Sequence, residues 1–200
     1  MAAVRADLRE WLEHAALERE WIPWRFELAF GLAEQGGQRD PESRAEAVAL
    51  ESGIQLRGSI DLVERTEAGA LRVTDFKTGK ARARAGQITA GGTMLQPVLY
   101  ALAVEQLFPG VEVRSGRLYY CTATGGFSAV ETRLDEGARR AAGTVARVIG
   151  GALAAASFPR APAEGACTFC DFVAVCGPDA EERAAGKPRD AALYELRTLR

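Results

Sequence analysis

GSIDLVERTEAGALRVTDFKTGK, residues 58–80, contains two runs of apolar and β-branched residues on either side of a short turn. The runs at 59–65 and 71–76 predict β-strands, and the tripeptide Glu-Ala-Gly at 67–69 predicts the turn between them. Two strands with so short a connection pair antiparallel, as a hairpin. The stretch therefore predicts two neighbouring strands of one sheet.

Two carboxylates and a lysine lie on this predicted hairpin. Asp61 and Asp75 stand on adjacent strands, where paired neighbours lie roughly 5 Å apart. Lys77 follows Asp75 by two residues, so both side chains point to one face of the strand while Phe76 points to the other. Because an uncompensated charge in such an apolar strand would be costly, we expect these groups to act together.

Oxygen ligands of this kind suit Mg²⁺ or Mn²⁺, which keep several of their waters. An ion held there lowers the pKa of a bound water and neutralises charge that develops on a phosphate. The alternative is a surface strand with an ordinary ion pair, because a single Asp-x-Lys is common by chance. The longer pattern, Gly-x-x-Asp, a turn, an apolar strand ending in Asp-x-Lys-Thr-Gly and then a helix, favours the metal site.

Residues 4–21, well before the hairpin, predict an amphipathic helix. Its apolar face is made of Val4, Leu8, Trp11, Leu12 and Ala15. Alternation at 24–30 predicts a strand, the polar stretch at 34–45 predicts a loop, and 47–57 predicts a further strand. The hairpin is thus expected to have strands before it as well as after it.

After the hairpin, the basic and glycine-rich residues 80–92 predict a mobile loop. A helix follows, with Pro97 tolerated in its first turn. Residues 111–123 and 127–134 predict two more strands, and Asp135 predicts the cap of another helix. The apolar face of that last helix is made of Ala141, Val145, Val148 and Ile149.

The order of these elements indicates an α/β fold with a central mixed β-sheet flanked by helices. A chain of 200 residues is long enough for one domain with an appendage. We expect an N-terminal helix at 1–23, a core at 24–158, and a cysteine-rich segment with a polar tail at 159–200. No internal repeat interrupts this division.

The composition is that of an ordinary globular chain, 48% hydrophobic and 26% charged. The longest apolar runs fall short of the roughly 18–20 residues that span a bilayer, and the charged residues within 1–13 do not predict a signal peptide. We therefore expect a cytoplasmic protein with no membrane partner. The net charge of −2 and the pI of about 5.6 argue weakly against a free-standing nucleic-acid binder, although a metal site itself requires acidic ligands.

Three motifs resemble the successive nuclease motifs of the RecB/AddB family: RGSID at 57–61, DFKTGK at 75–80 and QPVLYAL at 96–102. That family belongs to the PD-(D/E)XK nuclease superfamily, which includes related CRISPR-associated exonucleases, and the resemblance covers roughly residues 24–177. It implies a restriction-endonuclease-like core and metal-dependent cleavage of DNA. It further implies an exonuclease that works with a helicase domain or subunit in DNA double-strand break repair or recombination.

The resemblance implies a role for each residue of the acidic motifs. Asp61 and Asp75 would be ligands of Mg²⁺ or Mn²⁺, with the carbonyl of Phe76 as a third ligand. Lys77 would be the catalytic lysine. Glu27 resembles an acidic position on the strand before the site, and the alternative for it is a solvated strand residue.

Gln96 and Tyr100 lie at i and i+4 on one helical face. The resemblance implies that both line the catalytic site and contact DNA, and the basic Lys80 is expected to bind DNA with them. The alternative is that Gln96 is an ordinary helix N-terminal residue and Tyr100 a core aromatic.

Three of the four cysteines, Cys167, Cys170 and Cys176, lie close together near the end of the chain. Such a cluster indicates a metal or iron–sulfur site rather than disulfides. AddB-like members use a similar C-x-x-C-D-F-x-x-x-C-G trio with an upstream cysteine to hold a [4Fe–4S] cluster, and zinc is the alternative. Cys121, in an apolar strand, is expected to be a small buried hydrophobe, so a fourth ligand would lie outside this chain.

Many members of the family carry a metal-ligating histidine on an N-terminal helix. The single histidine here, His14, lacks the expected neighbours and is predicted to be a half-exposed helix residue. We therefore expect a chain that is part of a larger polypeptide.

Two other functions stay open. A non-catalytic DNA-end-binding or structural module is favoured by the missing histidine ligand and disfavoured by the intact Asp-Asp-Lys set. An unrelated zinc-binding domain would need Cys121 or His14 to complete its site.

Overall fold

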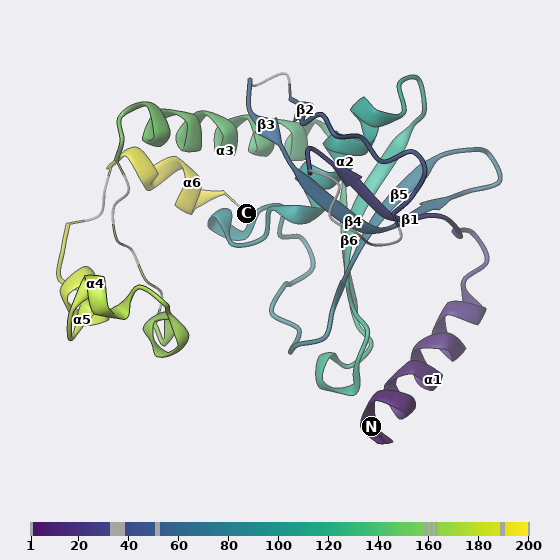
Figure 1. The fold of residues 1–200 in the computed structure, drawn as a ribbon, viewed down its shortest axis with the longest axis horizontal. Helices are drawn as coiled ribbons and strands as arrows, with labels where there is room; N and C mark the ends of the chain where they lie inside the picture. The colour runs from purple at the N-terminus through teal and green to yellow at the C-terminus, as the bar shows by residue number, and fades with distance from the viewer. Residues whose placement is uncertain are drawn as a thin grey trace.

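A five-stranded mixed sheet with the strand order β1-β4-β5-β6-β7 forms the centre of the protein (Figure 1). The computed structural model describes residues 2–32, 39–50, 53–157, 160, 162, 164–188 and 191–199. The strands of this sheet are β1 (Ile22–Phe30), β4 (Gly58–Arg65), β5 (Leu71–Lys77), β6 (Val113–Tyr120) and β7 (Ala129–Arg133). The hairpin expected at 58–80 is therefore β4 and β5, which pair antiparallel.

Strands β5 and β6 pair in parallel, and the helix α2 (Gln96–Leu107) lies between them in the chain. A parallel pair requires such a crossover because its two strands run in the same direction. The helix begins at Gln96 with Pro97 in its first turn, as expected from the sequence. A mixed sheet with helices on it confirms the predicted α/β, restriction-endonuclease-like class.

The hydrophobic core lies between the sheet and helices α2 and α3 (Glu136–Ala154). Its fully buried side chains include Leu28, Phe30, Ile60, Val63, Leu71, Val73, Val98 and Val104. Asp135 caps α3 as predicted, since its Oδ1 accepts from the backbone N–H of Ala138 at 2.9 Å. Burying one face of each helix and one face of the sheet is what fixes these layers.

Helix α2 lies directly against the sheet at Gly116 on β6. A Cβ atom at this position would overlap the backbone carbonyl of Pro97. The glycine therefore lets the first turn of α2 rest directly on β6. That contact determines where the N-terminal end of α2, including Gln96, meets the ends of β5 and β6.

The opposite face of the sheet carries a buried network of charges in place of apolar side chains. Arg72 on β5 donates to both carboxylate oxygens of Glu64 on β4, at 2.9 and 2.8 Å. Arg117 on β6 donates to the same carboxylate at 3.0 and 3.1 Å and to Thr74 at 3.0 Å. Glu64 and Arg72 are 3% and 4% exposed, so their charges are compensated by one another rather than by water.

The helix α1 (Ala2–Leu17) stands off from the sheet (Figure 1) and shares a cavity with this charged face, without burying any of its own residues. It ends earlier than the residue 21 predicted. The single apolar face predicted for it is wrong: Val4, Leu8 and Leu12 face solvent, with 57%, 52% and 57% of their surfaces exposed. Helical periodicity shows that a helix has two faces, but it cannot tell which face meets the rest of the protein.

The predicted strand at 47–57 is instead a two-stranded ribbon of β2 (Val48–Ala49) and β3 (Gln55–Leu56). Residues 51 and 52, within that prediction, and 34–38 of the predicted loop lie outside the described residues. Gly53, with φ +82°, adopts the left-handed conformation that a tight reversal requires. A glycine inside a run of strand formers was the signal for this reversal.

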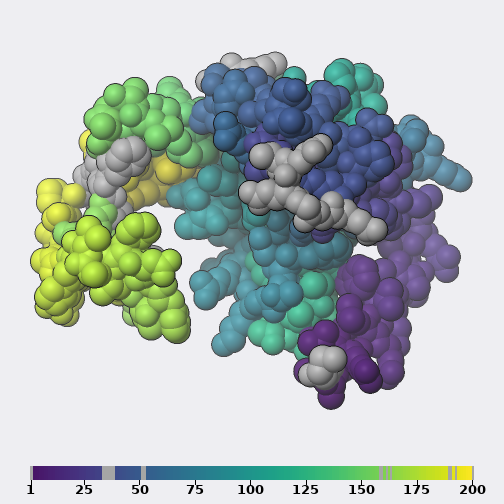
Figure 2. Space-filling model, in the orientation of Figure 1, coloured from purple at the N-terminus to yellow at the C-terminus, as the bar shows by residue number. Residues whose placement is uncertain are grey.

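The C-terminal segment is set off from the sheet and its helices (Figure 1, Figure 2). It contains the short helices α4 (Val173–Cys176) and α5 (Ala180–Ala185). The last helix, α6 (Tyr194–Thr198), returns to the core, where the backbone N–H of Gly91 donates to the carbonyl of Leu199 at 2.9 Å. In the part of the chain that the structure describes, no helix combines the length and the apolarity needed to cross a membrane.

Gly116→Ala is predicted to destabilise the protein by about 3 kcal/mol, at the upper end of overpacking costs, because the new methyl group displaces the first turn of α2. Gly143→Ala in α3 is the matched control, since a Cβ there meets no atom within 4 Å and alanine favours a helix. Urea denaturation of both variants measures the difference. Equal stability of the two variants would contradict the close contact.

Candidate active site

The two carboxylates lie where strands β4 and β5 separate. The strands pair from Arg65–Leu71 as far as Leu62–Thr74, and beyond that point β4 continues only in its pairing with β1. Asp61 spans the opening with its side chain, whose Oδ2 accepts from the backbone N–H of Phe76 at 2.7 Å. The Asp61 carboxylate thus takes the place of a backbone hydrogen bond between β4 and β5. This bond also fixes the carboxylate beside the end of β5.

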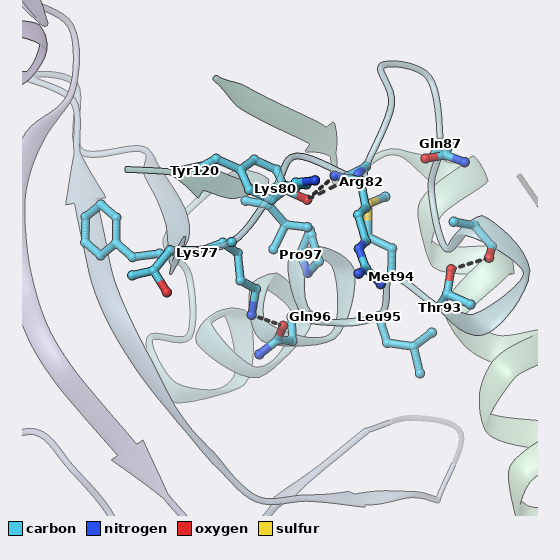
Figure 3. A pocket seen from close by; sticks show the side chains of 16 residues that line it. Lys77, Lys80, Arg82, Gln87, Thr93, Met94, Leu95, Gln96, Pro97 and Tyr120 are labelled. Carbon is cyan, nitrogen blue, oxygen red and sulfur yellow. Dashed lines mark hydrogen bonds between the residues drawn. The ribbon is translucent and has the colours of Figure 1, made fainter. Parts of the chain in front are cut away.

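Asp75, Lys77 and Gln96 form a closed triangle at the end of β5. Lys77 Nζ donates to Gln96 Oε1 at 2.7 Å (Figure 3). Gln96 Nε2 in turn donates to Asp75 Oδ1 at 2.8 Å. Lys77 Nζ also lies 2.6 Å from Asp75 Oδ2 as an ion pair. Asp75 and Lys77 therefore share one face of β5, as predicted. Helix α2 places Gln96 within hydrogen-bond distance of both side chains.

The second oxygen of Asp75 is buried and lacks a hydrogen bond of normal geometry despite its ion pair with Lys77. Burial raises the pKa of the Asp75 carboxyl above its ordinary value, and the negative charge of Asp61 adds to the rise. Lys77 lowers it in part, without reversing the direction. A carboxylate in this state gains from any further positive charge brought to it.

This donor set fits a hard divalent cation. Mg²⁺ is commonly bound through one or two carboxylates, with waters and substrate phosphates as its other ligands, and Asp75 Oδ2 is a buried oxygen whose neighbour is the ammonium of Lys77, at 2.6 Å. Among the described residues, no three His, Cys, Asp or Glu side chains gather into a metal-ligand group. The chain would therefore supply few ligands, and the carbonyl of Phe76 as a third ligand stays a prediction.

A cavity of about 540 Å³ adjoins Lys77 and Gln96 on the α2 side of the sheet (Figure 3). Lys77, Lys80 and Arg82 line it, and no acidic side chain does so among the residues that the structure describes. The hydroxyl of Tyr120 accepts from the backbone N–H groups of Arg82 and Ala83, at 3.3 and 3.1 Å. Tyr120 thus fixes the loop after β5 against β6, and two exposed basic residues of that loop, Lys80 and Arg82, line the cavity.

Tyr100 packs beside the site rather than into the triangle. Its ring lies edge-on to Phe30 at 6.1 Å, and a Cβ on Gly58 would come within 3.1 Å of its hydroxyl. Gly58 precedes Asp61 by three residues, so the tyrosine supports the start of β4. This contact agrees with the core aromatic considered as the alternative for Tyr100, and its contact with DNA stays a prediction.

Glu27 stands opposite Asp61, between the pairs Phe26–Leu62 and Leu28–Ile60. Its φ of +51° is a left-handed conformation that is uncommon for a non-glycine residue. The alternation of faces breaks here, since Phe26 is exposed whereas Leu28 is fully buried. This irregularity turns both acidic side chains toward a second cavity, under α1.

His14 lines the same second cavity. Its Nδ1 lies 3.5 Å from the hydroxyl of Tyr119, and its ring lies edge-on to Phe127 at 5.3 Å. The histidine is exposed, which agrees with the half-exposed helix residue predicted. It contacts aromatic groups of β6 and the loop after it.

The three C-terminal cysteines lie in the segment set off from the sheet. Cys167 belongs to the 3₁₀ helix at Ala166–Phe169, Cys170 is exposed, and Cys176 ends α4. Cys121 lies far from them in the fold, at the end of β6, where its Sγ approaches the carbonyl of Lys77 at 3.7 Å. Cys121 is partly buried rather than fully buried as predicted. Desolvation raises the pKa of its thiol, so the residue is a neutral thiol and gives the trio no fourth thiolate.

Two features of the site were missed from the sequence. One is the network of Glu64, Arg72 and Arg117 on the face opposite the core, which acidic and basic residues facing each other on adjacent strands could have signalled. The other is the cavity under α1, whose lining comes from distant parts of the chain. Only the folded arrangement brings those parts together.

The sequence profile of the PD-(D/E)XK nuclease superfamily matches residues 2–177 of this chain. A similar curated protein is the "CRISPR-associated exonuclease Cas4/endonuclease Cas1 fusion" of Myxococcus xanthus strain DK1622. It is 33% identical over 169 residues, which cover 82% of this chain and 27% of the relative. This chain thus spans about a quarter of the length of that relative.

Asp75→Asn is predicted to raise the melting temperature of the metal-free protein by about 2–4 °C, the shift for about 1 kcal/mol in a chain of this size. The reason is that a raised pKa means that folding disfavours the ionised carboxyl. Scanning calorimetry measures the shift, and Glu67→Gln, in the exposed turn of the same hairpin, is the control.

The same shift predicts a pH dependence. The stability contributed by protonated Asp75 is fully present below the pKa of the unfolded chain and is lost as pH rises through the higher folded-state value. The wild type should therefore approach the stability of Asp75→Asn as the solution is acidified through that window. A variant less stable than the wild type at neutral pH would contradict this reasoning.

Proposed function

The chain belongs to the PD-(D/E)XK nuclease superfamily, and from this premise we propose that it is a metal-dependent deoxyribonuclease that degrades DNA from an end. The observation that carries the proposal is the triangle of Asp75, Lys77 and Gln96 beside Asp61. The name of the Myxococcus xanthus relative includes an exonuclease, which supports cleavage from an end.

Asp61 and Asp75 would hold Mg²⁺ or Mn²⁺, and the ion would activate a water and neutralise charge on the phosphate. Lys77 brings a positive charge to the same point, where it can orient the attacking water and stabilise the transition state. Gln96 holds Lys77 and Asp75 together by one hydrogen bond to each. Asp61 is kept in place by the N–H of Phe76.

Lys80 and Arg82 would bind the DNA backbone. Both line the basic cavity next to Lys77, and cationic side chains of this kind bind phosphates without reading sequence. Tyr120 holds their loop through two backbone bonds. The overall charge of −2 is therefore compatible with DNA binding, because the positive charge is gathered beside the site.

Several finer expectations stay predictions. A helicase partner and a role in DNA double-strand break repair or recombination are implied by the resemblance to the RecB/AddB family. An iron–sulfur cluster or zinc at Cys167, Cys170 and Cys176 is likewise a prediction from the sequence. The cytoplasmic location is a prediction from the sequence.

Lys77→Ala, Asp61→Asn and Asp75→Asn are each predicted to lower the rate of DNA cleavage at least about a hundredfold. The measurement is the loss of end label from linear DNA with Mg²⁺ or Mn²⁺. Glu67→Gln, at the far end of the same hairpin, should cleave like the wild type. No cleavage by folded wild-type protein with either metal would overturn the proposal and favour the DNA-end-binding module.

Lys80→Gln is predicted to weaken DNA binding on every sequence and to reduce the slope of log affinity against log salt by about 1. Fluorescence anisotropy of labelled DNA at several salt concentrations measures both quantities. The control is Arg140→Gln on the exposed side of α3, where the arginine pairs with Glu136. An unchanged slope for Lys80→Gln would exclude a phosphate contact at that position.

A further inference from the structure

A second cavity, of about 740 Å³, lies between α1 and the charged face of the sheet. Its lining is unusually rich in aromatic side chains, which come from α1, β1, β5, β6 and nearby loops. They are Trp11, Trp21, Phe26, Phe76, Tyr119 and Phe127. Small-molecule sites are commonly cavities of about 300–1,000 Å³ with mostly apolar and aromatic walls.

The cavity exists because α1 stands away from the sheet. The helix touches it through a few side chains, among them Trp11, edge-on to Phe76 at 5.7 Å, and His14, beside Tyr119. Its aliphatic residues face solvent instead of filling the space. A helix that only closed a core would bury its apolar residues, so this arrangement points to an occupant of the space.

The cavity adjoins the catalytic groups directly. Asp61 lines it, and so does Phe76, whose neighbours in the chain are Asp75 and Lys77. Phe76 also lines the basic cavity on the other side of the sheet. Each cavity therefore reaches the catalytic residues from its own face of the sheet.

The charges of the two cavities are opposite. The basic cavity has Lys77, Lys80 and Arg82, whereas the carboxylates of Glu27 and Asp61 line the cavity under α1. Glu18 and Glu64 line it as well, but both are paired with Arg72. The guanidinium of Arg117 in that cavity is already bonded to Glu64 and Thr74. A phosphate is therefore disfavoured under α1, whereas an uncharged ring with polar edges is not.

A nucleotide has these same two parts, an anionic phosphate and a flat neutral base. We propose that the cavity under α1 binds the unpaired base of the terminal nucleotide, while the adjoining phosphate lies at Lys77 and the basic cavity. Aromatic side chains stack on any base, since every base has a π face. The polar groups of His14 and Glu27 can meet the edge of the base.

This inference rests on the proposed function and specifies its substrate. A base can enter the cavity only after it leaves its partner in a duplex, which costs a few kcal/mol of unpairing and unstacking. Single-stranded ends are therefore the preferred substrate. The alternative occupant of the cavity is an apolar side chain of a partner protein. That alternative would be favoured if the terminal base changed neither the Trp11 fluorescence nor the affinity for DNA.

Single-tryptophan reporters test the inference in the cleavage-deficient Asp75→Asn protein. The chain has three tryptophans; Trp21→Phe with Trp24→Phe leaves Trp11 in the cavity, and Trp11→Phe with Trp21→Phe leaves Trp24. Trp24 is the control because it packs on Phe108 at 4.9 Å beside the core. Circular dichroism establishes that each variant is folded.

The probes are short single-stranded oligonucleotides with an intact or an abasic nucleotide at the 3′ or the 5′ end. An intact end is expected to quench Trp11 and not Trp24, and an abasic sugar at the engaged end should bind about tenfold more weakly. Anisotropy of the labelled DNA measures binding independently of the tryptophan signal. DNA that binds without quenching Trp11, or with equal affinity for both kinds of end, overturns the inference.

Two neighbouring substitutions on α1 provide a second test. Trp11→Ala should bring the affinity ratio of intact to abasic ends close to 1, whereas Leu12→Ala, on the solvent side of the helix, should keep it. Equal ratios for the two variants count against the inference. If the wild type cleaves DNA with the same affinity for intact and abasic ends, the proposed nuclease activity is supported and the base-binding cavity is contradicted. If the protein prefers intact ends but cleaves no DNA, the base-binding cavity is supported and the nuclease activity is contradicted.

Discussion

The central position of β5 constrains the rest of the structure. The strand has neighbours on both sides, yet it carries Arg72, Thr74 and Asp75, each 6% exposed or less. Because a buried charge without a partner would be too costly to keep, each neighbouring element must supply a group to β5. Strand β4 supplies Glu64, β6 supplies Arg117, and α2 supplies Gln96.

The two faces of β5 meet this requirement to different extents. On the charged face, the carboxylate of Glu64 receives bonds from Arg72, Thr74 and Arg117, so its oxygens are fully used. On the other face, Asp75 keeps one buried oxygen without a hydrogen bond, and its pKa is raised by burial. The protein therefore keeps a carboxylate whose ionised form is disfavoured even beside the ammonium of Lys77, and a further positive charge would stabilise it.

Three irregular features of the fold lie at this same point. Strands β4 and β5 separate at Asp61, and Glu27 opposite it takes a left-handed backbone. Gly116 lets the first turn of α2 lie on β6, which sets Gln96 over Asp75. Departures from regular structure cost stability and persist where the surroundings enforce them. Here they open the end of the sheet to both cavities while the opposite end of the hairpin stays regular.

The sequence by itself determined the hairpin, the common face of Asp75 and Lys77, the start of α2 and the cap of α3, because each depends on residues close together in the chain. It also carried the superfamily motifs, which are short and local. Tertiary structure alone decided which face of α1 meets the sheet, that Tyr100 supports Gly58, and that Cys121 lies beside Lys77 rather than with the other cysteines. The physical reason is that periodicity and spacing record the conformation of a segment, whereas contacts between distant segments depend on how all the buried surfaces and charges are satisfied together.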